Sequence, residues 1–153
     1  MLTLLLLLHG LMAVALLGAI SHQTASLLRR RAATGNLFVE RYARVDGARF
    51  TLPISLLYFG VVVLGSMLYP AYRLDVRIPF EELGLQWAVG LFEVKEHVAG
   101  IGLGILPLYI AVWRRPEAGP SQANRRLVTT FVALVVWFDF VVGHVLNNIR
   151  GLA

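Results

Sequence analysis

The chain contains no cysteine and only a small share of charged residues, and both features narrow its class. Without cysteine, the chain can form no disulfide, no cysteine-ligated iron–sulfur cluster and no thiolate metal site. Charged residues make up 15% of the 153 positions, whereas hydrophobic residues make up 58%, and the mean hydropathy is +0.70. Soluble domains are about 45–50% apolar by a similar count, so the composition predicts an integral membrane protein.

Apolar residues are concentrated in four long runs, each about as long as a membrane-spanning helix. These runs cover residues 2–28, 52–69, 94–113 and 127–147. Because about 20 helical residues cross the hydrocarbon core of a lipid bilayer, we expect an all-α protein, an integral membrane four-helix transmembrane bundle formed as a single domain by residues 1–153. An amphipathic outer segment is expected at about 80–93 and a short interfacial helix at about 37–45.

Basic residues lie mostly on one side of the predicted spans. Ten arginines fall in the connections between the first and second spans and between the third and fourth, against four basic residues on the opposite side. Positively charged connections stay in the cytoplasm, so both termini are expected outside, in a multi-pass protein of the bacterial inner (cytoplasmic) membrane. Topology therefore explains the net charge of +5, and no nucleic-acid partner is expected.

Three of the four histidines are expected at one depth, in the outer half of the membrane. A helix rises about 1.5 Å per residue, which places His9, His97 and His144 near this level on three different spans. His22 lies near the cytoplasmic end of the first span instead. Glu93 comes one turn before His97 and shares its helix face. Ionisable residues within a membrane usually mark a functional site, so this level is the candidate site.

Two imidazoles on facing helices supply the axial ligands that a b-type haem requires. We therefore expect two of the three outer histidines to hold one haem b near the outer leaflet. Arg73, Arg77 and Arg150 are candidate partners of the haem propionates. The expected function is electron transfer by a subunit of a larger membrane redox complex.

The two histidines of the first span carry a family resemblance. His9 and His22 are thirteen residues apart, which resembles membrane b-type cytochromes, in which one helix carries one histidine for each of two stacked haems. Thirteen residues turn a helix by about 1300°, which leaves the two rings about 140° apart, and no second span carries two histidines. One outer haem is therefore expected rather than two. Three further segments resemble small bacterial membrane proteins of no assigned function, a likeness that implies no activity: YPAYRLDVR, FEVKEH and GHVLNNIRG.

Two other interpretations remain open. The side chains of His9, His97 and His144, together with Glu93 or Asp139, would suit a non-haem zinc, copper or iron site, which would support redox chemistry on a quinone or a lipid. Alternatively, the protein binds no cofactor and is an accessory or structural subunit that packs against other membrane subunits. The sequence matches no phosphate loop or dinucleotide fingerprint, so motifs do not decide between these functions.

Overall fold

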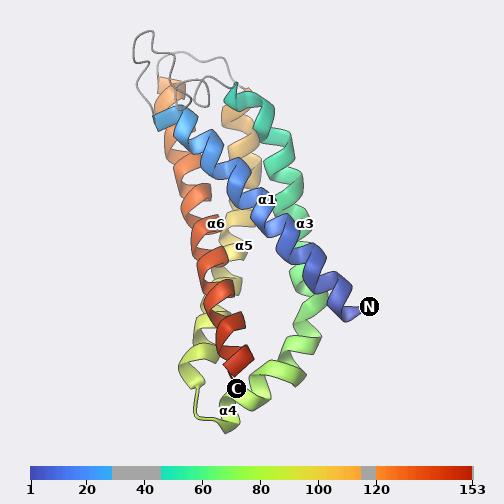
Figure 1. Ribbon diagram of the computed structural model, residues 1–153. Coiled ribbons are helices and arrows are strands. Elements are labelled where there is room, and N and C mark those ends of the chain that lie inside the picture. Colours follow the sequence, from blue (N-terminus) through green and yellow to red (C-terminus); the bar gives the residue numbers. More distant parts are fainter. Residues whose placement is uncertain (29–45, 115–119, 153) are drawn as a thin grey trace, which may run out of the picture.

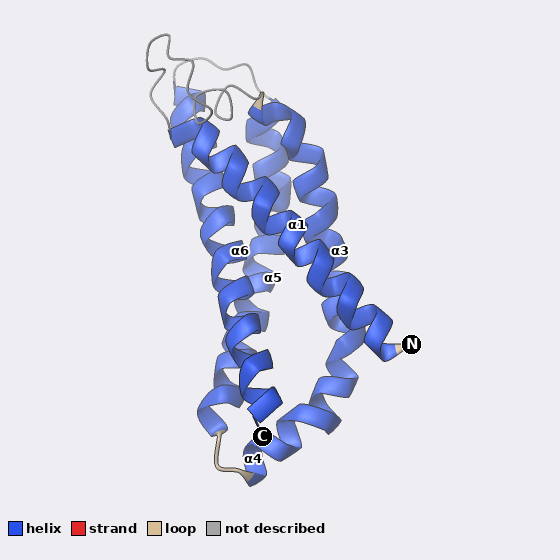
Figure 2. Cartoon of the chain, viewed as in Figure 1, coloured by secondary structure: helices blue, strands red, loops and turns tan. Residues whose placement is uncertain are grey.

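The computed structural model describes residues 1–28, 46–114 and 120–152, and all regular structure in this part of the chain is helical (Figure 2). Four long helices form the body of the bundle (Figure 1): α1 (Leu2–Leu28), α3 (Thr51–Tyr72), α5 (Gln86–Arg114) and α6 (Pro120–Leu152). Three short segments flank α3: the 3₁₀ turn η1 (Gly47–Phe50), the π-helical turn η2 (Arg73–Arg77) and α4 (Ile78–Glu82). The interfacial helix expected at 37–45 lies outside the described residues.

Each of the four long helical segments is long and apolar enough to cross a membrane. The candidate spans are Leu2–Leu27, Gly47–Glu82, Gln86–Arg114 and Gln122–Gly151. Their outward faces carry large apolar side chains, such as Leu11 and Leu127, which are each 70% exposed. Such faces are unfavourable in water and compatible with hydrocarbon tails. The predicted all-α bundle with four potential transmembrane helices is therefore confirmed for the described residues.

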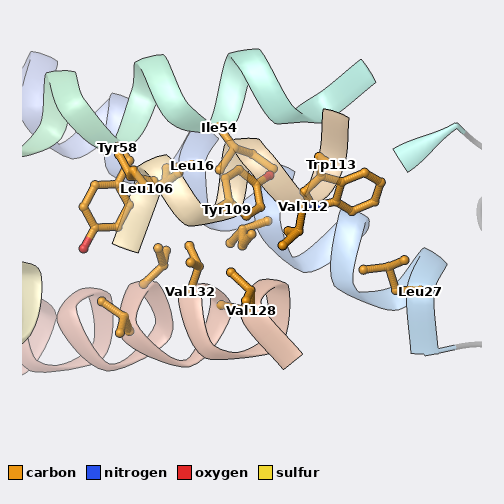
Figure 3. Packing of buried hydrophobic residues seen from close by; sticks show 14 residues of the cluster. Leu16, Leu27, Ile54, Tyr58, Leu106, Tyr109, Val112, Trp113, Val128 and Val132 are labelled. Atoms are coloured by element: carbon orange, nitrogen blue, oxygen red, sulfur yellow. The ribbon is translucent and has the colours of Figure 1, made fainter. Parts of the chain in front are cut away.

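The helices bury their apolar side chains in two separate clusters. Helices α5 and α6 pack against each other, and α1 packs against α3 and α6. In Figure 1, α1 crosses α3, and the second half of α3 lies away from α6. The larger cluster joins all four long helices (Figure 3), and its fully buried members include Ile20, Ile54, Tyr109 and Val132. The smaller cluster surrounds Phe80 of α4 and the facing residues of α5 and α6.

The connection between α3 and α5 differs from the expected amphipathic segment at about 80–93. Helix α4 ends at Glu82, and a tight turn follows at Gly84, whose φ of +74° is a conformation that glycine adopts readily. Helix α5 then begins at Gln86 and continues without a break into the third predicted span. The second half of the expected segment is therefore the first part of α5.

Candidate functional site

A cavity of about 230 Å³ lies between the four long helices. The polar residues that line it are His9, Tyr58, Ser66, Lys95, Glu96 and Asp139. Its other walls are apolar or glycine, and three of its lining residues, Leu16, Tyr58 and Val136, belong to the larger cluster. All lining residues fall inside the candidate spans, so the cavity belongs to the potential membrane-spanning part of the bundle.

Helix α1 places the imidazole of His9 at the cavity. The ring lies against Gly65 on α3, where an added Cβ would be 3.4 Å from His9 Cε1. A larger residue at position 65 would therefore press on the imidazole. The Nδ1 atom of His9 is buried and makes no hydrogen bond of standard geometry within the described residues, while the ring also interacts with the backbone of Val61 on α3. Packing against α3 thus holds the ring at the cavity.

Asp139 brings a carboxyl group to the same cavity from α6. Its Oδ1 atom is buried, and the described part of the chain offers it no hydrogen-bond partner. A buried polar atom without a partner costs about 1–3 kcal/mol, and such an exception in a native protein calls for a specific explanation. Below, His9 Nδ1 and Asp139 Oδ1 are together called the cavity pair.

Two neighbouring residues of α5 contribute opposite charges to the cavity. Lys95 Nζ donates a hydrogen bond to Glu96 Oε1 at 2.8 Å, and both side chains are partly buried. The ammonium group also lies 5.3 Å from the centre of the Phe92 ring, within cation–π distance. On α6, Gly143 packs against the lysine stem, since an added Cβ would be 3.6 Å from Lys95 Cε. Lys95 is therefore fixed beside the cavity with its charge compensated.

An aromatic stack joins α3 and α5 on the side of the cavity nearer α4. The rings of Tyr72 and Phe92 lie 3.5 Å apart between centroids at an angle of 11°, and Tyr69 lies 6.2 Å from each of them. An ion pair between Arg77 and Glu93 at 3.6 Å connects η2 to α5 close to this stack. These contacts hold the two helices together next to Lys95.

Tyr58 closes the cavity on the opposite side. Its hydroxyl donates a hydrogen bond to the carbonyl of Ala99 at 2.9 Å. The ring lies directly over Gly102, where a side chain would collide with it. Tyr58 therefore connects α3 to α5 at the cavity, which it lines together with Leu16 and Val136 of the larger cluster.

Of the three histidines expected to meet, His9 alone lines the cavity. His97 is exposed, and its Nδ1 lies 2.7 Å from the backbone oxygen of Glu93, while His144 is exposed on α6. Within residues 1–28, 46–114 and 120–152, no group of three or more histidine, aspartate and glutamate side chains is placed to hold a metal ion. Ligation of a haem or metal ion by His9, His97, His144 and Glu93 therefore stays a prediction.

The other residues singled out from the sequence lie away from the cavity. Arg73 and Arg150 are exposed, and Arg77 pairs with two carboxylates. Their part in binding haem propionates stays a prediction. His22 lies near the end of α1, where its ring stacks on Phe50 at 4.9 Å between centroids.

The sequence alone did not predict that Tyr58, Ser66 and Lys95 belong to one site. A signal was present, because positions 58, 62 and 66 follow the spacing that places residues on one helix face. Spacing alone does not show which face of α3 packs against the other helices. The structure shows that the face with positions 58, 62 and 66 lines the cavity.

No family model, no curated protein and no solved structure matches the chain. The residues that line the cavity are therefore the evidence for its chemistry. The lining combines apolar walls with an imidazole, a carboxyl group and an ammonium–carboxylate pair. Such a set can donate hydrogen bonds to a small ligand and accept them from it. It can also exchange a proton with a bound hydroxyl group.

Proposed function

We propose that this protein is a subunit of a membrane redox complex and that its cavity binds the ring of a lipid-soluble quinone or quinol. The observation that carries the proposal is the cavity pair, whose two buried atoms make no hydrogen bond of standard geometry within the described residues and belong to side chains lining one cavity. Small-molecule sites typically combine apolar walls with a few such polar groups. Ionisable residues inside a membrane usually mark a substrate or proton pathway.

The polar groups of the cavity suit both redox forms of a quinone ring. The carbonyl oxygens of the oxidised ring accept hydrogen bonds, and the Lys95 ammonium has three N–H donors, one of which is bonded to Glu96. The hydroxyl groups of the reduced ring donate hydrogen bonds, for which the cavity pair supplies acceptors. Apolar walls that include Val61 and Phe140 would contact the faces of the ring.

Two interpretations from the sequence compete with this proposal. Electron transfer through a haem b would need a second axial ligand beside His9, or ligation by His97 or His144 at the surface facing another subunit. A cofactor-free accessory subunit would bind neither haem nor quinone. The quinone proposal accounts for the buried, unbonded atoms of His9 and Asp139 within the described residues, which neither alternative requires.

Photolabelling with an azidoquinone tests the proposal. Purified protein in phospholipid nanodiscs is illuminated with a short-chain azidoquinone, and mass spectrometry locates the label. We expect the label on peptides that line the cavity, and we expect decylubiquinone to displace the azidoquinone.

His9→Gln and Asp139→Asn should each weaken quinone binding by roughly tenfold, because a hydrogen bond to a ligand contributes about 1–2 kcal/mol.

Matched substitutions at exposed positions control for the change of residue type. Asp75→Asn and His144→Gln lie outside the cavity lining and should label like the wild type. Label distributed over the lipid-facing surface, or unchanged labelling of Asp139→Asn, would refute the quinone proposal. A Soret band in the purified protein that disappears in His97→Gln or His144→Gln would favour haem instead.

We further infer that both termini face the outside of a bacterial inner membrane. The end of α5 and the beginning of α6, whose sequences include Arg114 and Arg126, lie at the end of the bundle where α1 ends, and the C-terminus lies at the opposite end (Figure 1). Because the chain has no cysteine, a single introduced cysteine is an unambiguous probe. In spheroplasts, Gly151→Cys should react with a membrane-impermeant maleimide, whereas Asn124→Cys should react only after permeabilisation. The reverse pattern would place the termini in the cytoplasm.

A further inference from the structure

The cavity is partly open, and two of the residues that line it from α3 and α5 are exposed at the surface of the bundle. Ser66 on α3 and Gly100 on α5 both line the cavity, and both are exposed. The Ser66 hydroxyl donates a hydrogen bond to the carbonyl of Val62 in its own helix, at 3.0 Å, so it does not bridge to α5. At Gly100 an added Cβ would meet no described atom within 4 Å, which indicates open space beside the helix. Ser66 and Gly100 are called the lateral portal below.

The two ends of the cavity are packed. Toward α4, the rings of Tyr72 and Phe92 stack between α3 and α5, and the Lys95 ammonium lies 5.3 Å from the Phe92 ring. Toward the opposite end, Tyr58 is bonded to the carbonyl of Ala99 and buried in the larger cluster. The lateral portal lies inside the candidate spans. Its opening therefore faces the region that hydrocarbon chains of the bilayer would occupy.

The volume of the cavity limits which part of a quinone it holds. Its volume of about 230 Å³ is below the range of about 300–1,000 Å³ that is typical of pockets enclosing drug-sized ligands. This space suits one substituted ring and is too small to enclose an isoprenoid tail as well. An apolar tail is much more favourable in hydrocarbon than in water, so it has to leave the cavity on the lipid side.

We propose that the lateral portal admits a quinone ring from the bilayer and that the tail stays in the lipid between α3 and α5 while the ring contacts the cavity pair. This inference rests on the proposed function. Gly100 is then a specificity-determining position, because the absence of a side chain keeps the passage open on α5. Ser66 has the same role on α3, where its small side chain is turned back to its own helix.

Gly100→Leu, compared with Gly104→Leu, tests the portal. Gly104 lies one turn further along α5, is exposed and is not part of the cavity lining, and an added Cβ there also meets no described atom within 4 Å. Both substitutions add the same apolar side chain to an exposed helix position, so helix content and melting temperature should not fall. We expect Gly100→Leu to lower the rate of azidoquinone labelling by about tenfold or more and Gly104→Leu to leave it unchanged.

Ser66→Leu narrows the portal from α3 and provides a second variant, which should slow labelling as Gly100→Leu does. If the wild type is labelled in the cavity but both portal variants react as fast as Gly104→Leu, the portal is wrong and quinone binding stands. If the wild type is not labelled in the cavity at all, the proposed function fails, and the portal fails with it.

Discussion

Gly102→Ala is expected to lower the free energy of unfolding by about 2–4 kcal/mol, through overpacking and loss of a buried hydrogen bond. Gly102 is buried where α5 contacts both α3 and α6. An added Cβ would collide with the Tyr58 hydroxyl, lie 2.8 Å from Tyr58 Cζ and lie 2.9 Å from Val135 Cγ1. At least one of the three helices would therefore have to shift.

Neither neighbour of Gly102 can move away without a further loss. Tyr58 is 3% exposed and Val135 is 5% exposed, so both are surrounded by packed atoms. Rotation of the Tyr58 ring would also break its hydrogen bond to the carbonyl of Ala99. Because Tyr58 lines the cavity, the same rotation would change the shape of the ligand site, and azidoquinone labelling should fall together with stability.

Thermal unfolding in detergent, followed by circular dichroism, measures the effect. Gly104→Ala is the matched control, since an added Cβ there meets no described atom within 4 Å. This control should be as stable as the wild type or more stable by up to about 1 kcal/mol, because alanine favours the helix more than glycine does. Equal stability of the two alanine variants would show that α3, α5 and α6 are not packed this closely.

The membrane helices could be predicted because the thickness of the hydrocarbon core demands about 20 apolar residues in each span. The runs at 2–28 and 127–147 accordingly fall within α1 and α6. The continuation of α3 through η2 and α4 was not predicted, because the second apolar run ends at residue 69 and the charged residues Arg73 and Arg77 follow it. In the structure Arg77 remains part of a helical path, and an ion pair with Glu93 on α5 compensates its charge.

The candidate site could be predicted only in part, because hydropathy sets the depth of a residue and packing sets the direction in which it points. His9 and His144 were expected at one level, yet the ring of His9 lies against Gly65 at the cavity whereas His144 is exposed. Asp139 stood out as an acidic residue inside a span. That its carboxyl group shares a cavity with His9 depends on how α1 packs against α6, a contact between the two ends of the chain.

Gln23→Leu is expected to lower the free energy of unfolding by about 2–4 kcal/mol, because it removes two hydrogen bonds from a buried site. Gln23 has no exposed surface. Its Nε2 donates to the carbonyl of Gly47 at 2.8 Å, and its Oε1 accepts from the Tyr109 hydroxyl at 2.6 Å. This one side chain therefore joins α1 to η1 and to α5, through a tyrosine that lies within the larger cluster (Figure 3). Leucine retains the apolar packing and removes both bonds.

A double-mutant cycle with Tyr109→Phe isolates the hydrogen bond between the two side chains. Both single variants lose this bond, so the double variant should lose less stability than their sum, by about 1–2 kcal/mol in thermal unfolding. Thr24→Val is the control on α1, because the Thr24 hydroxyl donates within its own helix, to the carbonyl of Ile20 at 2.8 Å, and its loss should cost no more than about 0.5 kcal/mol.

Additive losses in this cycle would mean that Gln23 stabilises the bundle by packing alone. A coupled result would have a consequence for the cavity, because α1 exposes many of its leucines and depends on a few specific contacts for its orientation. Rotation of α1 about its axis would turn His9 away from Gly65. Gln23→Leu should therefore also weaken quinone labelling, although Gln23 is not part of the cavity lining, and Thr24→Val should leave it unchanged.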